Sequence, residues 1–134
     1  MNNSRVPPPV TFRGRILGIA VLVVAQYLIG AIHVSSGLLL LYASPDIYSL
    51  YTLVFSVLVF VFAYALWNGR SWGWIGTVAV SIFVIIVDSL TLLNLPSIPG
   101  IPKSAGFGEI TYSVLILFYL SKARVRTKYK ILQK

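Results

Sequence analysis

The stretch SIFVIIVDSLTLL, residues 81–93, places a carboxylate, Asp88, among apolar and small hydroxyl-bearing side chains. The 134-residue sequence has only three acidic residues, so one inside an apolar run indicates either a packed polar contact or a functional site. The run belongs to a longer apolar segment, about residues 72–94. Because a membrane-spanning helix needs roughly 20 predominantly apolar residues, this segment predicts a transmembrane helix that carries an ionisable group.

The composition of the whole chain indicates an integral membrane protein. Apolar residues make up 57% of it and charged residues 10%, whereas average soluble domains carry about 25% charged residues. The net charge of +8 comes from basic residues near the two ends and in one short loop, which is typical of an orientation signal and not of a nucleic-acid partner. With no cysteine, the chain has no disulfide, thiolate metal site or cysteine nucleophile of its own.

Four segments have the length and apolarity of membrane helices, at about residues 16–42, 49–67, 72–94 and 105–120. The first follows a basic N-terminal stretch and is interpreted as a helix, not as a removed signal peptide. The third break is LPSIPGIPKSAGFG, residues 95–108, which runs into the start of the fourth segment, and its repeated prolines forbid a continuous helix. The sequence therefore predicts an all-α, four-transmembrane-helix bundle with up-down-up-down topology, formed by a single membrane domain, residues 1–134.

The distribution of Lys and Arg predicts the orientation in the cell membrane. Of the 11 basic residues, only Lys103 falls on the side opposite the N-terminus, which leaves ten on the N-terminal side. Because basic residues accumulate in cytoplasmic loops, both termini are expected to be cytoplasmic. The residues predicted to anchor the chain at the inner interface are Arg13, Arg15, Trp67, Arg70, Trp72, Trp74, Lys122, Arg124, Arg126, Lys128 and Lys130.

The basic tail, residues 121–134, allows two interpretations. The first is a solvated segment attracted to the anionic lipids of the inner leaflet, with about 1 kcal/mol for each basic residue near the surface. The second is a docking segment for a partner. Attraction to anionic membrane lipids is the expectation carried forward.

Each predicted helix carries one polar stripe at helical spacing. Lipid cannot form hydrogen bonds with such groups, so the stripes are expected to face the interior of the bundle. The four stripes are Gln26, Gly30, His33 and Gly37; Thr52, Ser56 and Ala63; Thr77, Ser81, Asp88 and Thr91; and Glu109, Tyr112, Ser113 and Ile116.

The ionisable residues of these stripes are expected at similar depth. His33 lies 18 residues after Arg15, and Asp88 lies 18 residues after Arg70, so each is ~27 Å from the inner surface by helix rise. Glu109 lies 13 residues before Lys122, or ~20 Å from that surface. With Gln26 from the first stripe, these three side chains form a candidate intramembrane polar cluster: His33, Asp88, Glu109 and Gln26.

Three interpretations of this cluster compete. In the first it is a structural clamp, in which Asp88 pairs with His33 or with hydroxyl groups, and Glu109 caps its own helix. In the second it is a proton or ion site, since histidine titrates near neutral pH. The third is a metal site, because one histidine and two carboxylates suit Zn, Mn or Fe. No HxxxH or ExxH spacing supports that site, so neither a metal nor another cofactor is expected.

Two segments of the second half carry a resemblance to known proteins. They are WNGRSWGW, residues 67–74, and FYLSKARVRTKY, residues 118–129, and a Pro/Gly loop lies between them. In this respect the chain resembles small uncharacterised four-helix integral membrane proteins that are common in archaea. The matching residues are Arg70, Trp72, Trp74, Tyr119, Leu120, Lys122 and Arg124. The resemblance implies the four-helix topology and, because that family has no established activity, no catalytic residues.

The expected function is that of a small non-catalytic accessory or stabilising subunit of a larger membrane complex, such as an energy-transducing or oxidising enzyme. Short loops leave little mass in water, so other membrane subunits and membrane lipids are the expected partners. No GxSxG or Ser–His–Asp pattern is present, so an enzyme is not expected. The alternative is a small transporter or proton- or ion-conducting protein that uses His33, Asp88 and Glu109.

Overall fold

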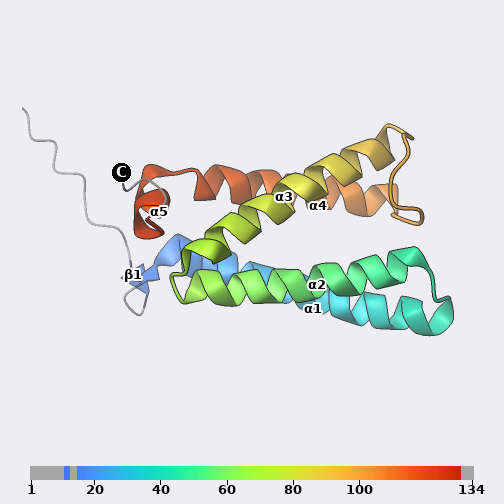
Figure 1. The fold of residues 1–134 in the computed structure, drawn as a ribbon, viewed down its shortest axis with the longest axis horizontal. Coiled ribbons are helices and arrows are strands. Elements are labelled where there is room, and N and C mark those ends of the chain that lie inside the picture. Colours follow the sequence, from blue (N-terminus) through green and yellow to red (C-terminus); the bar gives the residue numbers. More distant parts are fainter. Residues whose placement is uncertain (1–10, 13–14, 131–134) are drawn as a thin grey trace, which may run out of the picture.

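A computed structural model describes residues 11–12 and 15–130 of the chain, and these residues are almost entirely helical (Figure 1). A two-residue antiparallel pair, β1 (Thr11–Phe12) and β2 (Arg15–Ile16), precedes the first helix. The helices are α1 (Leu17–Ala43), α2 (Ile47–Trp67), α3 (Ser71–Leu92), α4 (Lys103–Leu120) and α5 (Ala123–Lys128). The four long helices agree with the predicted segments to within two residues at each end.

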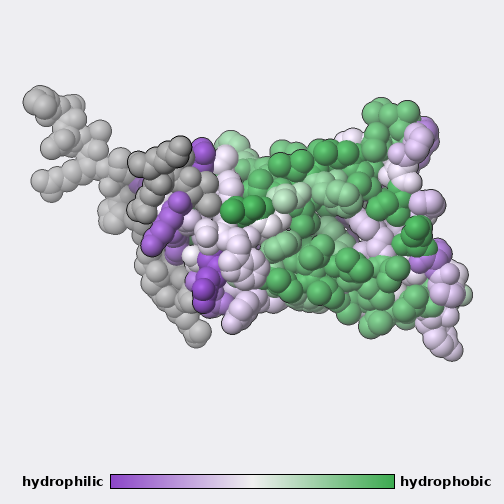
Figure 2. All heavy atoms as spheres, in the orientation of Figure 1, coloured by the Kyte–Doolittle hydropathy of each residue, from purple (hydrophilic) through white to green (hydrophobic). Residues whose placement is uncertain are grey.

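Three helices, α1, α2 and α3, are long and apolar enough to cross a membrane. Helix α4 has 18 residues, but Lys103 and Glu109 lower its apolarity, so it is not one of the three. Figure 2 shows a broad hydrophobic band across the middle of the face in view, with hydrophilic residues gathered toward the two ends. The surface of the helices is therefore suited to contact with lipid.

The helices form two antiparallel hairpins, α1–α2 and α3–α4, which are held together by the packing of α2 on α3 (Figure 1). The turn at residues 68–70, β1, β2 and α5 lie at one end, which we call the basic end. The connections 44–46 and 93–102 lie at the other, which we call the loop end. Helices α1 and α4 meet through side chains, such as Tyr119 of α4 against Gly18 of α1.

Local chemistry explains where the helices begin and turn. Asp46 starts α2 with a reciprocal capping box: its carboxylate accepts a hydrogen bond from the Ser49 amide at 2.8 Å, and the Ser49 hydroxyl accepts one from the Asp46 amide at 3.1 Å. The α2–α3 turn contains Gly69 with φ +69°, a left-handed conformation that glycine adopts without steric cost. Beyond this turn, Gly73 lets α3 approach the backbone of α2, since an added Cβ would lie 2.6 Å from the Leu66 amide nitrogen.

The polar stripes predicted from the sequence face the interior. Half-buried members of these stripes are His33, Thr91, Glu109 and Tyr112. The fully buried polar members are Gln26, Thr52, Ser56, Thr77, Ser81, Asp88 and Ser113. The middle and loop-end parts of the bundle therefore have a polar interior, as lipid-facing helices require.

The basic end has an apolar core, and part of the tail belongs to it. Val125 and Tyr129 are 2% and 1% exposed, and they pack with Ile19, Leu66 and Leu120. The Tyr129 hydroxyl also donates a hydrogen bond to the Leu66 carbonyl at 2.8 Å. The expectation of a solvated tail is wrong for Val125 and Tyr129, which fold back onto the bundle, whereas Lys122, Arg124 and Lys130 are exposed. Residues 131–134 of the tail lie outside the described residues.

Candidate functional site

The side chains of His33 and Glu109 join α1 to α4. The imidazole Nε2 lies 3.3 Å from the Glu109 Oε1, and the imidazole Nδ1 lies 2.9 Å from the Ile29 carbonyl oxygen. A carbonyl oxygen only accepts, so Nδ1 carries a hydrogen and donates it. In a neutral imidazole Nε2 is then a bare acceptor, which would face an acceptor-only carboxylate. The contact therefore needs one further proton, carried either by the imidazolium or by a protonated Glu109.

Glu109 does not cap its own helix. Helix α4 begins at Lys103, and no acidic residue lies in its first turn, so the capping interpretation is wrong. The helix begins directly after Pro102, two residues before the start at about residue 105 that the sequence predicts. Glu109 consequently lies within α4, beyond its first turn. The exposed fraction of its side chain is 24%, and that of His33 is 19%.

Asp88 is fully buried and forms no hydrogen bond with any described residue. Its relative exposure is 0%, and neither of its carboxylate oxygens has a partner. It packs on Gly106 of α4, where an added Cβ would lie 3.4 Å from the Asp88 Cβ, one helical turn before Glu109. The expected pairing of Asp88 with His33 or with Ser and Thr hydroxyls is therefore wrong, because His33 pairs with Glu109. Asp88 lies near Glu109, and its carboxylate oxygens have no partner within hydrogen-bonding distance among the described residues.

An internal cavity of about 30 Å³ lies between the two hairpins. All four long helices line it, with His33 and Glu109 among its residues. Three buried polar atoms on lining residues have no hydrogen-bond partner among the described residues: Gln26 Oε1, Thr77 Oγ1 and Tyr112 OH. A volume of this size holds one or two water molecules, and such sites satisfy otherwise unpaired polar groups. Of the predicted cluster, Gln26, His33 and Glu109 line this cavity.

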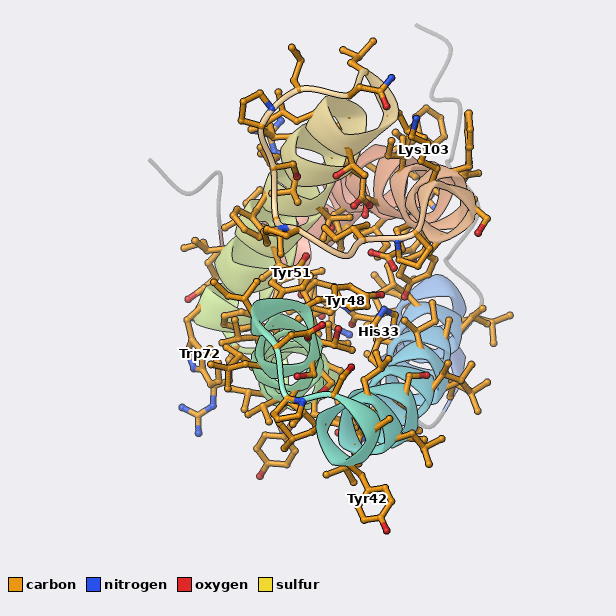
Figure 3. All side chains as sticks on the ribbon, turned by 90° about the vertical axis from the view of Figure 1, so that its right-hand side faces the viewer. His33, Tyr42, Tyr48, Tyr51, Trp72 and Lys103 are labelled. Atoms are coloured by element: carbon orange, nitrogen blue, oxygen red, sulfur yellow. The ribbon has the colours of Figure 1, made fainter. Side chains whose placement is uncertain are left out.

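The cavity lies on the loop-end side of the apolar core. Figure 3, viewed from the loop end, shows His33, Tyr48 and Tyr51 between the helices, whereas Tyr42 points outward. The Tyr51 ring stacks on Phe55 at 5.9 Å between ring centres, and Phe55 in turn contacts His33 at 5.3 Å. Tyr48 and Tyr51 lie near the start of an apolar segment, where tyrosines are typical of an interfacial aromatic belt. Their spacing in the sequence does not show whether such a residue lies between the helices at the loop end or in an outward-facing belt.

The predicted anchoring residues that the structure describes gather toward the basic end. Trp74 is half-buried and donates a hydrogen bond from Nε1 to the Leu120 carbonyl at 3.2 Å, whereas Trp72 is 46% exposed. Arg13 lies outside the described residues, as does the side chain of Arg15. The remaining members are Trp67, Arg70, Lys122, Arg124, Arg126, Lys128 and Lys130, on the α2–α3 turn and around α5.

The comparisons with known proteins and the search for metal-binding groups gave no match. No family model, curated protein or solved structure matches the chain. Within residues 11–12 and 15–130, no group of three or more His, Cys, Asp or Glu side chains is arranged to hold a metal ion. The resemblance to small archaeal four-helix membrane proteins therefore stays a prediction.

Proposed function

We propose that this chain is a small proton-translocating membrane protein whose proton-binding site is the His33–Glu109 pair. The observation that carries the proposal is the hydrogen-bonding geometry of His33. Its Nδ1 donates to the Ile29 carbonyl, so its 3.3 Å contact with Glu109 needs a bound proton. A pair that holds a proton inside a membrane bundle and is partly accessible is the elementary unit of a proton path.

Two neighbouring features support this function. Asp88 supplies a second buried carboxyl group near Glu109, and no described residue lies within hydrogen-bonding distance of its oxygens. The cavity beside the pair offers unpaired oxygen atoms of Gln26, Thr77 and Tyr112, which orient water molecules able to relay a proton. The apolar core separates this cavity from the basic end, so passage across the membrane requires the two hairpins to move relative to each other.

The proposal includes a fourth span and both termini on the cytoplasmic side. Helix α4 has 18 residues, or ~27 Å of helix, close to the roughly 30 Å of a bilayer core. It packs antiparallel along α3 (Figure 1). The cytoplasmic assignment follows from the concentration of basic residues at the basic end, while Lys103 starts α4 at the other end.

Cysteine labelling tests this topology without background, because the sequence has no cysteine. In intact cells a membrane-impermeant maleimide is expected to label Lys103→Cys and to leave Lys130→Cys unlabelled until the membrane is opened. Both residues are exposed, so burial in the protein does not protect either position. Labelling of both variants from the same side would show that α4 does not cross the membrane.

Proton flux into liposomes tests the function. The purified chain is expected to carry protons down an imposed pH gradient. Glu109→Gln is expected to reduce the rate by roughly a hundredfold or more, since a positioned proton-transfer group typically contributes at least that much. Asp46→Asn is the matched control, because it also removes one carboxylate, outside the cluster, and asparagine caps a helix as well as aspartate. Equal flux in the wild type and Glu109→Gln would contradict the proposal.

The second candidate is the accessory subunit of a larger membrane complex. The observation that favours it is the shortness of the connections, residues 44–46, 68–70 and 93–102, which leave little of the described chain outside the helices. Gentle detergent extraction of the tagged protein, followed by native gel analysis, distinguishes the two. Stoichiometric co-purification with a larger membrane enzyme would favour the subunit, and a lone monomer or homo-oligomer would exclude it.

A further inference from the structure

A row of aromatic rings crosses the loop-end half of the bundle and ends at the proton site. The Tyr51 ring stacks on Phe55 at 5.9 Å between ring centres, and on its other side it lies 6.4 Å from the ring of Phe83 in α3. Phe55 in turn contacts His33 of α1 at 5.3 Å. Figure 3 shows Tyr51 and His33 between the helices. The row therefore connects three helices through Tyr51 and Phe55 of α2.

Two surface grooves reach Tyr51 from outside, and its side chain lines both of them. One groove, of about 510 Å³, lies between the start of α2 and the connection 93–102 at the loop end. The other, of about 380 Å³, lies between α2 and α3. Phe55 lines the second groove and also the internal cavity, which His33 and Glu109 line from the other helices. Tyr51 and Phe55 thus separate the surface of the bundle from its cavity.

The Tyr51 hydroxyl is buried, although packing alone does not require it. Its oxygen has no hydrogen-bond partner among the residues that the structure describes. The carboxyl groups of Glu109 and Asp88 lie near enough to interact with it electrostatically. A buried hydroxyl without a partner costs free energy, and phenylalanine would fill the same space in the aromatic row without that cost. The position of the hydroxyl near two carboxyl groups indicates a role in their proton chemistry.

A phenol hydroxyl can pass on a proton without gaining or losing charge, because it has one hydrogen to donate and lone pairs that accept another. A hydronium ion on the loop-end side gives a proton to the Tyr51 oxygen and becomes water. The original O–H bond of Tyr51 breaks as its hydrogen moves to a carboxylate oxygen of Glu109. The carboxylate becomes a carboxyl group, and tyrosine is neutral before and after the transfer.

We propose that the Tyr51 hydroxyl relays protons between water at the loop end and the His33–Glu109 pair. This relay rests on the proposed function, since it provides the loop-end entrance to the proton site. The ring of Tyr51 and the neighbouring Phe55 fill the space between the outer grooves and the cavity. A proton can cross this layer through the hydroxyl, whereas a hydrated metal cation cannot.

The Tyr51→Phe variant tests the relay, because it keeps the ring and removes only the hydroxyl. Proton flux into liposomes is expected to fall by roughly a hundredfold or more, as for the loss of a positioned proton-transfer group. Thermal unfolding in detergent is expected at or above the wild-type temperature, since an unpaired buried group is removed. Wild-type flux in Tyr51→Phe, alongside a loss of flux in Glu109→Gln, would overturn the relay and leave the proton site in place.

Tyr42→Phe is the matched control. It removes the same group at the loop end of α1, from a side chain that is 94% exposed and points outward (Figure 3). Its flux is expected to stay within about twofold of the wild type, as for a surface substitution. An equal loss of flux in Tyr42→Phe and Tyr51→Phe would overturn the relay, because the effect would not depend on a buried hydroxyl.

A second measurement separates the relay from transport across the membrane. The exchange of the His33 Nε2 hydrogen with water, followed by ¹⁵N NMR in detergent, is expected to slow by roughly a hundredfold in Tyr51→Phe and to stay unchanged in Tyr42→Phe. Equal exchange rates in the two variants would overturn the relay. Slower exchange in Tyr51→Phe, in a chain whose wild type carries no flux, would support the relay and contradict proton translocation.

Discussion

The Asp88→Val variant is expected to be at least as stable as the wild type and to lose proton flux by at least roughly tenfold. Asp88 is fully buried, and its carboxylate oxygens have no hydrogen-bond partner among the described residues. Replacing an unsatisfied polar group by an apolar group of similar shape is neutral or stabilising. The carboxyl group beside Glu109 is lost at the same time, so function and stability are expected to separate in this variant.

Thermal unfolding in detergent and flux in liposomes measure the two effects. The control is Thr91→Val, which places the same side chain one turn further along α3. The Thr91 hydroxyl lies 3.0 Å from the Val87 carbonyl oxygen and 2.9 Å from the Ser97 hydroxyl, and it donates its one hydrogen to one of them. Its loss is expected to cost about 1 kcal/mol and to leave flux within about twofold, because Thr91 does not line the cavity. If Asp88→Val unfolds several degrees below the wild type, Asp88 is part of a structural clamp and the account of the site fails.

The Tyr129→Ala variant is expected to detach α5 from the bundle. The ring is 1% exposed within the apolar core, and truncation of a buried aromatic side chain costs about 3–5 kcal/mol. The loss falls on a helix of six residues, which is too short to be stable without its tertiary contacts. Trypsin cleavage at Arg124, Arg126 and Lys128 is therefore expected to accelerate by at least about tenfold.

Tyr129→Phe separates packing from hydrogen bonding in the same position. It keeps the ring and removes the hydroxyl that donates to the Leu66 carbonyl. That carbonyl still accepts from the Gly69 amide at 3.0 Å, so the expected cost is only about 1 kcal/mol. Cleavage of Tyr129→Ala at the wild-type rate would mean that α5 is not held by Tyr129.

Sequence reasoning located the long helices and their inward stripes because both depend on local pattern. Apolar segments of membrane length and prolines at 96, 99 and 102 define the helices. Because lipid cannot form hydrogen bonds with polar side chains, Gln26 and Ser81 are predicted to face the interior, and both are buried in the structure.

Contacts between distant residues were less accessible to sequence reasoning. Helical spacing predicts how deep a residue lies in the membrane and on which side of its helix it lies. It does not predict how two helices are rotated against each other. It therefore placed Asp88 and His33 at similar depth, but it could not predict that His33 contacts Glu109. Val125 and Tyr129 lie among charges in a short segment, and only the apolar core shows that they are buried. The cavity depends on the fit of four helices, for which no local signal exists.

The titration of His33 tests the central claim most directly, because the sequence contains only one histidine. Its ¹⁵N NMR signals report the proton on each imidazole nitrogen separately. The account predicts that Nδ1 stays protonated throughout, and that the titration of Nε2 changes in Glu109→Gln and in Asp88→Val but not in Asp46→Asn. An Nε2 titration that is identical in all four proteins would contradict a shared proton between His33 and Glu109.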